Sequence, residues 1–229
     1  MIKKLNNIGD CGIVCDFGEE VNHKINGNVI KLFHHIKKEV LRGNLSGILN
    51  YTPSYNKLII DQVNILSKIA EEKESRVTHI KPHGALNNMA CENYDLAKII
   101  ADSIIEVNKN LIFLVPTGSE MEKAGKKLNL KVAAEIFADR NYEDDGNLVS
   151  RKKSNAMITD PEAAKKHVIK MVETQAINCY SGKQIPCTID SICVHGDGKN
   201  AVNTAKQIKD GLIESGVTLM QLNKMKKFL

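Results

Sequence analysis

Short apolar runs alternate with longer amphipathic stretches from about residue 62 onward. In the longer stretches, apolar residues recur every three or four positions, which is the period of a helix. The short runs predict strands at 77–81, 111–115, 131–135 and 191–195, and the stretches between them predict helices at about 93–109, 118–128, 161–175 and 199–215. Repeated strand–helix units indicate a parallel sheet, either open or part of a barrel. Four strands are too few to close a barrel by themselves.

Two of these helices also begin with recognisable capping sequences. Thr117-Gly118-Ser119-Glu120 has the spacing of a capping box, and Asp160 precedes Pro161 at the first helical position. Both patterns satisfy backbone N–H groups that a helix leaves without partners at its start.

The first 60 residues follow a different pattern. Residues 11–17 are strand-like, 21–41 have helical spacing that stops at Gly43, and 47–51 form a second short strand. Residues 55–61 (YNKLIID) alternate and predict a third strand after the turn at 52–54. We therefore expect a small N-terminal α+β (βαββ) domain at 1–63 and a larger α/β domain at 64–229.

Composition excludes several classes of protein. The net charge is only +5, there is no Trp, and aromatic residues make up 4%, so a nucleic-acid stacking surface is not indicated. The apolar runs are far too short to span a membrane. The six cysteines include no CxxC pair, which favours reduced thiols in a cytoplasmic protein.

Polar side chains follow three of the four predicted strands. Lys81 and His83 follow the first, and Glu135, Asp139 and Arg140 lie at the end of the third. Lys81 could polarise a carbonyl or hold a phosphate, His83 suits acid–base or metal chemistry, and Arg140 suits a carboxylate or phosphate. The plainer alternatives are ion pairs that satisfy the Lys and His, and an Asp–Arg pair that fixes a loop.

The fourth strand ends in His195, followed by Gly196, Asp197 and Gly198. Glycines allow the backbone to approach a ligand, and the following helix start suits an anion. The irregular segment 141–151, which ends at Arg151, predicts a long loop over the sheet ends. Because parallel strands end at one edge, we expect these groups to converge on a site that hydrolyses a small polar molecule. There is no GxSxG elbow and no Walker A motif.

Four segments, HIKPHGAL, TGSEMEKAGKKLNL, EIFADRNYEDDGNLVSR and ICVHGDGKNAV, resemble the LamB/YcsF family, known as the A subunit of 5-oxoprolinase. The resemblance implies a (β/α) barrel of the glycoside hydrolase/deacetylase-like type. It also implies ATP-dependent opening of 5-oxoproline to glutamate with the partner subunits B and C.

Under this resemblance Lys81, His83, Asp139 and His195 are the expected catalytic residues. The expected substrate- or phosphate-binding residues are Glu135, Arg140, Arg151, Gly196, Asp197 and Gly198. A metal-dependent deacetylase-like hydrolase is a competing hypothesis, with His83, Asp139, His195 and Asp197 as candidate ligands of a divalent ion.

The N-terminal sequence (IGDCGIVCDFGEEVNHKINGNVIKLFHHI, then GILNYTPSYNKLIID) is similar to the start of the KipI-like family, which supplies the B subunit of 5-oxoprolinase. This suggests a fusion that joins near 61–65. Opening segments of the LamB/YcsF barrel, such as D-L-N-x-D-x-G-E, are absent, so we expect an incomplete barrel. Its open sheet edge predicts a homo-oligomer. A catalytically decayed remnant or a partner-binding module is the non-enzymatic alternative.

Overall fold

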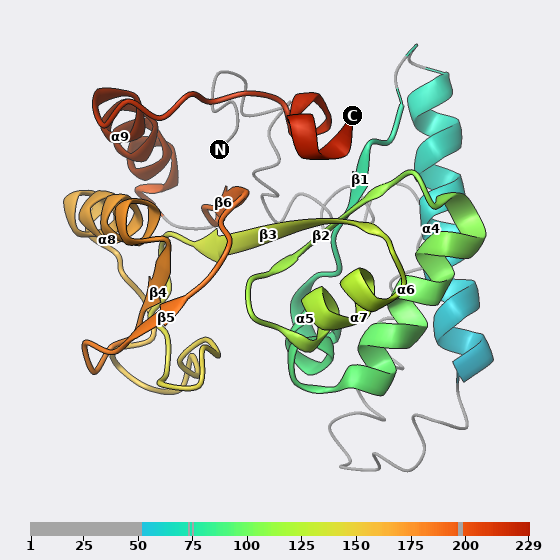
Figure 1. The fold of residues 1–229 in the computed structure, drawn as a ribbon, viewed down its shortest axis with the longest axis horizontal. Helices are drawn as coiled ribbons and strands as arrows, with labels where there is room; N and C mark the ends of the chain where they lie inside the picture. Colours follow the sequence, from blue (N-terminus) through green and yellow to red (C-terminus); the bar gives the residue numbers. More distant parts are fainter. Residues whose placement is uncertain (1–51, 73, 75, 197–198) are drawn as a thin grey trace.

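A computed structural model describes residues 52–72, 74, 76–196 and 199–229 of the chain. Its centre is a four-stranded, wholly parallel sheet in the order β1-β2-β3-β6. The strands are β1 (His79–Ile80), β2 (Ile112–Pro116), β3 (Lys131–Phe137) and β6 (Ser191–Cys193). The sheet is strongly twisted and curled, as Figure 1 shows, so the predicted α/β fold with a parallel sheet is confirmed.

Helices on either side of the sheet form two groups (Figure 1). The first group lies beside β1 and β2, and the second lies beside β6. The first comprises α4 (Thr52–Glu71), α5 (Gly84–Glu92), α6 (Tyr94–Asn108) and α7 (Glu120–Lys127); the second comprises α8 (Pro161–Thr174) and α9 (Ala201–Glu214). A small antiparallel hairpin, β4 (Ala176–Asn178) and β5 (Gln184–Pro186), extends from the second group.

Successive residues of the central strands face opposite sides of the sheet, as strand geometry requires. Phe113 and Val115 of β2 pack with the helices α4–α7. Ile112 and Leu114 face the other side, where the C-terminal 3₁₀ helices η1 (Leu222–Lys224) and η2 (Lys226–Phe228) cover them. The C-terminal segment therefore covers part of the sheet face opposite α4–α7.

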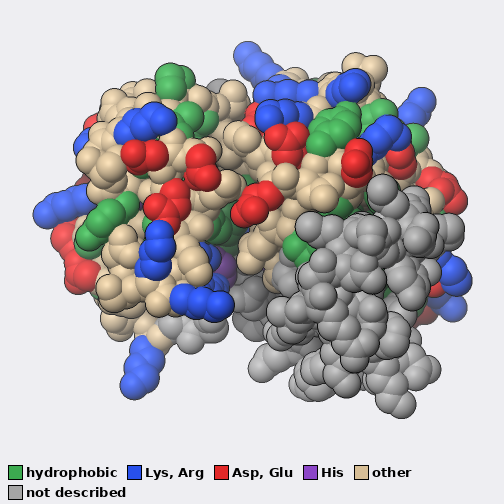
Figure 2. All heavy atoms as spheres, turned by 90° about the horizontal axis from the view of Figure 1, so that it is seen from below, with side chains coloured by type: hydrophobic (Ala, Val, Ile, Leu, Met, Phe, Trp, Pro, Cys, Tyr) green, Lys and Arg blue, Asp and Glu red, His purple; other side chains and the backbone are tan. Residues whose placement is uncertain are grey.

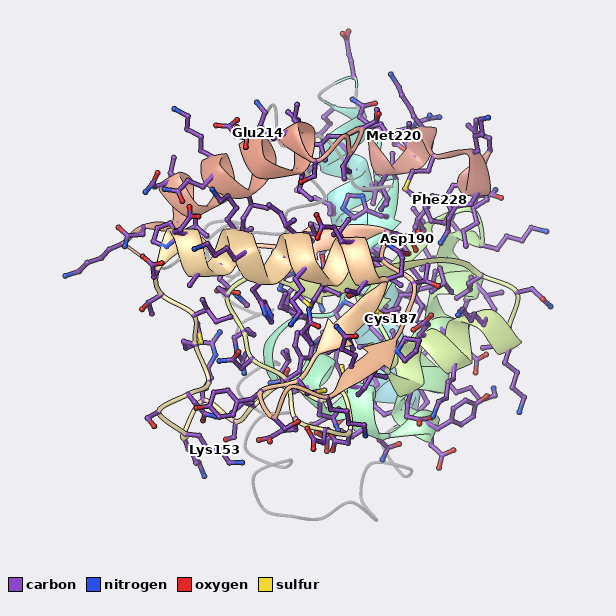
Figure 3. All side chains as sticks on the ribbon, turned by 60° about the vertical axis from the view of Figure 1, so that its left-hand side comes forward. Lys153, Cys187, Asp190, Glu214, Met220 and Phe228 are labelled. Atoms are coloured by element: carbon purple, nitrogen blue, oxygen red, sulfur yellow. The ribbon has the colours of Figure 1, made fainter. Side chains whose placement is uncertain are left out.

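An ion pair helps to fix this C-terminal segment. The Lys227 Nζ lies 2.5 Å from the Asp190 carboxylate, and the same carboxylate accepts a 2.8 Å hydrogen bond from the Ala134 N–H of β3. Figure 3 shows Asp190 between the sheet and the segment that carries Phe228. One buried carboxylate thus ties the end of the chain to the central strand.

The capping predictions had different outcomes. Asp160 accepts a 2.8 Å hydrogen bond from the Ala163 N–H, and Pro161 is the first residue of α8, as predicted. The predicted box beginning at Thr117 was wrong, because α7 begins at Glu120 and Ser119 is its N-cap. Gly118 has a φ of +76°, a left-handed conformation that turns the chain before the helix.

The predicted strand at 55–61 was also wrong, because α4 runs continuously from Thr52 to Glu71. Tyr55, Ile59 and Val63 recur at helical spacing, and they are buried in the same cluster as α6. The alternation of apolar and polar residues over 55–61 is compatible with a strand, but burial of the Tyr55–Ile59–Val63 face against α6 favours the helix. α5 and the β4–β5 hairpin were not predicted.

The predicted N-terminal elements at 11–17, 21–41 and 47–51 lie outside the described residues. The expected boundary at 63/64 falls within α4, and the division into two domains stays a prediction. None of the helices in the described part of the chain is long and apolar enough to cross a membrane.

Candidate functional site

The end of β3 carries alternate residues that face one side of the sheet. Glu135 and Phe137 lie within the strand, and Asp139 follows its end. Lys81 comes directly after β1, and His195 follows β6 by two residues. Because the three strands are parallel, these side chains lie at the same edge of the sheet. In the sheet, β2 lies between β1 and β3, so the long Lys81 side chain reaches past β2 to Glu135.

Lys81 and Glu135 form a buried ion pair. The Lys81 side chain is 4% exposed, and that of Glu135 is wholly buried. Burial of the Lys81 ammonium acts to lower its pKa, but the charge and hydrogen bond of Glu135 outweigh burial and raise the pKa above the ordinary lysine value. Lys81 is therefore a fixed positive charge at neutral pH.

Cys193 of β6 lies near Lys81, close enough for the charge of the ammonium to act on its thiol. Burial raises the pKa of this thiol, although the Lys81 charge opposes the effect. A neutral thiol is a poor nucleophile, so the role of Cys193 is to pack in the hydrophobic core beside β6. Cys193 was not among the predicted site residues, although its position two residues before His195 placed it on the same strand face.

His195 and Asp139 form the second pair. The Nδ1 atom of His195 lies 2.8 Å from both carboxylate oxygens of Asp139. The two side chains are 12% and 13% exposed, so they are more accessible than Lys81 and Glu135. An ionised carboxylate accepts hydrogen bonds, and this contact therefore favours the tautomer with hydrogen on Nδ1. Nε2 then carries the lone pair of the imidazole.

Phe137 lies against both pairs. The Lys81 Nζ is 5.2 Å from the centroid of its ring, and the His195 ring stacks on it at 5.8 Å with an interplanar angle of 18°. Phe137 was not predicted from the sequence, although its place between Glu135 and Asp139 in EIFAD gives it the same strand face. The structure thus links four of the predicted site residues, Lys81, Glu135, Asp139 and His195, through one aromatic ring.

Arg140 has a different environment from the other predicted residues. Its Nη2 donates a 2.6 Å hydrogen bond to the Val149 carbonyl, and its Nε donates a 3.4 Å hydrogen bond to the Ala156 carbonyl. Burial lowers the pKa of this guanidinium, and the nearby charge of Arg151 adds to the effect. Arg140 therefore holds the loop after β3 in place through backbone carbonyls. The plainer interpretation expected an Asp–Arg pair in this role, but Asp139 is bonded to His195 instead. A direct contact with substrate stays a prediction.

The remaining predicted residues surround this cluster less closely. His83 is half-buried and occupies the N-cap position of α5, Arg151 is exposed, and Gly196 is exposed directly after His195. Asp197 and Gly198 lie outside the described residues. Figure 2 shows a furrow between the two halves of the described surface, where a histidine side chain reaches the solvent.

The predicted metal set is His83, Asp139, His195 and Asp197, and Asp197 lies outside the described residues. Within the ranges that the structure describes, no three His, Cys, Asp or Glu side chains come together in a way that could hold a metal ion. Asp139 and His195 are instead bonded to each other. Among the described residues nothing favours a divalent ion, and binding by the full set of four stays a prediction.

Comparison with known proteins decides the family. The model of the LamB/YcsF family matches residues 50–227. This chain belongs to the LamB/YcsF family. It is 45% identical over 178 residues to the 5-oxoprolinase A subunit of Clostridium beijerinckii, covering 77% of this chain and 70% of that protein. It is 44% identical over 160 residues to the 5-oxoprolinase A subunit numbered 2 of Bradyrhizobium diazoefficiens, covering 70% and 62%.

A solved structure of the same shape supports the assignment of the fold. The chain is similar to the lactam utilization protein from Thermus thermophilus, with a TM-score of 0.68 and 28% identity. That match covers 74% of this chain and 68% of the solved chain. The chain thus covers roughly two thirds of the length of these relatives. The matched range 50–227 includes Lys81, Glu135, Asp139 and His195.

Proposed function

We propose that this chain acts as the A subunit of a 5-oxoprolinase, which hydrolyses 5-oxoproline to L-glutamate with ATP and the partner subunits B and C. The names of its relatives support this substrate. The observation that carries the proposal is the Asp139–His195 pair beside the buried Lys81–Glu135 pair, at the carboxyl edge of the sheet. A base next to a fixed positive charge is what hydrolysis of a polarised carbonyl needs.

His195 is the proposed general base. With hydrogen on Nδ1 held by Asp139, Nε2 can take a proton from the attacking water. The water oxygen bonds to the lactam carbonyl carbon, the ring C–N bond breaks, and the nitrogen leaves as the amine of glutamate. Lys81 supplies positive charge near the carbonyl oxygen, while Glu135 keeps the ammonium in place. His83, half-buried after β1, is the proposed donor of a proton to the leaving nitrogen.

ATP, when bound, supplies the free energy that drives opening of a stable lactam. Its phosphates need backbone N–H groups and cations. The first turn of α9 fits this need, because its N-cap Asn200 makes no side-chain capping bond. Gly196, Asp197 and Gly198 precede this helix, and Arg151 is exposed, so we assign phosphate or carboxylate binding to the backbone of these residues and to Arg151, together with Arg140. Glu135 is buried against Lys81 and acts on the substrate through that lysine.

The cellular setting is part of the proposal. We place the protein in the cytoplasm, where its thiols stay reduced and ATP is available. Of the strands in the described part of the sheet, β1 and β6 each pair on one side only. An unpaired edge favours association, so we propose a homo-oligomer. Sedimentation that gives a folded monomer across micromolar concentrations would contradict this assembly.

Release of glutamate from 5-oxoproline, measured with ATP and the partner subunits B and C, tests the activity. We expect His195→Gln and Asp139→Asn to lower kcat by roughly 100-fold or more. Lys98→Gln, on the exposed face of α6, is the matched control and should leave kcat unchanged. Absence of turnover by the folded wild-type chain with both partners present would overturn the proposal.

A partner-binding module without activity is the second candidate. The chain covers only 70% of the Clostridium beijerinckii A subunit and 62% of the Bradyrhizobium diazoefficiens one, and this partial coverage favours a module without activity. Binding to the partner subunits B and C without glutamate release, measured by pull-down and by turnover on the same sample, would support this candidate. In that case 5-oxoproline and ATP would give no thermal stabilisation.

A further inference from the structure

Phe137 is in contact with Lys81 of one pair and His195 of the other, although its own ring has no titratable group. Phe137 is 4% exposed, so it offers little surface to a substrate. Its backbone N–H donates a 2.7 Å hydrogen bond to the Oη of Tyr142, which is itself buried. The last residue of β3 is therefore held at its backbone as well as by its ring contacts.

The alternation of β3 explains where this ring lies. Glu135, Phe137 and Asp139 are two residues apart, so their side chains follow one another along one face. Glu135 binds Lys81, and Asp139 binds His195. The phenyl ring occupies the position between the two carboxylates, with the Lys81 ammonium over it and the imidazole stacked against it.

Two carboxylates, one ammonium and one imidazole N–H so close together have more than one way to pair. Lys81 could turn to Asp139, and His195 would then lose the acceptor that fixes its tautomer. A flat apolar ring between the pairs opposes this exchange, because a charge that crossed it would lose its hydrogen bonds. The ring also limits rotation of the imidazole plane through stacking.

We propose that Phe137 is a positioning residue that keeps Lys81 on Glu135 and His195 on Asp139, and thereby holds the His195 imidazole with Nε2 available as base. The kinetic part of this inference rests on the proposed function. The spectroscopic part does not, because it concerns the tautomer of His195 alone.

The test compares Phe137→Leu with the control Phe113→Leu in the full chain. Both changes remove a buried phenyl ring, but Phe113 faces the helices on the opposite side of the sheet. The ¹⁵N shifts of the imidazole, identified by their loss in His195→Gln, report the tautomer. We expect Phe137→Leu to convert a single Nδ1–H form into a mixture, while Phe113→Leu keeps the wild-type signature.

Turnover with ATP and the partner subunits gives the second readout. We expect Phe137→Leu to lower kcat at least 10-fold with KM changed less than 3-fold, and the aromatic Phe137→Tyr to stay within 3-fold of wild type. An unchanged tautomer in Phe137→Leu, or the same mixture in Phe113→Leu, would overturn the inference. A tautomer change in Phe137→Leu alone, with no turnover by the wild-type chain, would support the positioning role and overturn the proposed activity instead.

Discussion

Removing one partner of the Lys81–Glu135 pair should destabilise the protein far more than removing both. Lys81→Met leaves the wholly buried Glu135 carboxylate without its cation, and Glu135→Gln leaves the ammonium without its anion. Breaking a buried pair in this way costs about 3–5 kcal/mol, because an unpaired buried charge keeps its desolvation penalty. For a domain of this size that corresponds to a fall in Tm of about 6–20 °C.

The double variant Lys81→Met/Glu135→Gln removes both charges. Its free energy of unfolding should exceed that of either single variant, which gives a coupling of about 3 kcal/mol or more in a double-mutant cycle. Urea unfolding followed by circular dichroism at pH 7.5 measures all four proteins. The exposed pair Lys98–Asp102 on α6, with an N···O distance of 2.7 Å, is the control and should show no measurable coupling.

A coupling below about 1 kcal/mol at Lys81–Glu135 would refute the reasoning, because it would mean that water reaches the pair and screens its charges. The pH dependence gives an independent check. The pKa of Lys81 is raised on folding, so its contribution is fully present below the ordinary lysine pKa and is lost only as pH rises through the folded value. Between pH 7 and 9 the contribution of Lys81 to the stability of the wild-type protein should therefore stay constant.

Two further predictions concern groups around the site. Burial lowers the pKa of His167 in α8, and its Nε2 has no hydrogen-bond partner among the described residues, so the free energy of unfolding should decrease as pH falls below about 6.5. Urea unfolding from pH 5 to 8 should show a smaller decrease for His167→Gln than for wild type. An identical pH profile for the two proteins would contradict this. Arg140→Met removes two hydrogen bonds that hold the loop after β3, so it should lower the free energy of unfolding by about 1–3 kcal/mol and speed tryptic cleavage after Arg151. Equal cleavage rates of wild type and variant would show that the loop does not depend on this guanidinium.

The sequence determined the parallel α/β architecture. The four strands and the helices at 94–108, 161–174 and 201–214 could be predicted to within about two residues, because long periodic stretches and clear caps are local signals. The same pattern placed Lys81, Glu135, Asp139 and His195 at strand ends, and parallel strands bring their ends to one edge. Residues 55–61 were mispredicted because the apolar positions of so short a segment fit both the strand period and the helix period. Only the contact of this segment with α6 decides between strand and helix.

The tertiary structure decided which of these groups are partners. The order β1-β2-β3-β6 brings Glu135 to Lys81 and Asp139 to His195, and no local spacing contains that order. Arg140 follows Asp139 in the chain, yet its guanidinium is bonded to the loop carbonyls of Val149 and Ala156. Pairing of charges depends on distances between strands and on burial, and both are set by the packed sheet and not by neighbours in sequence.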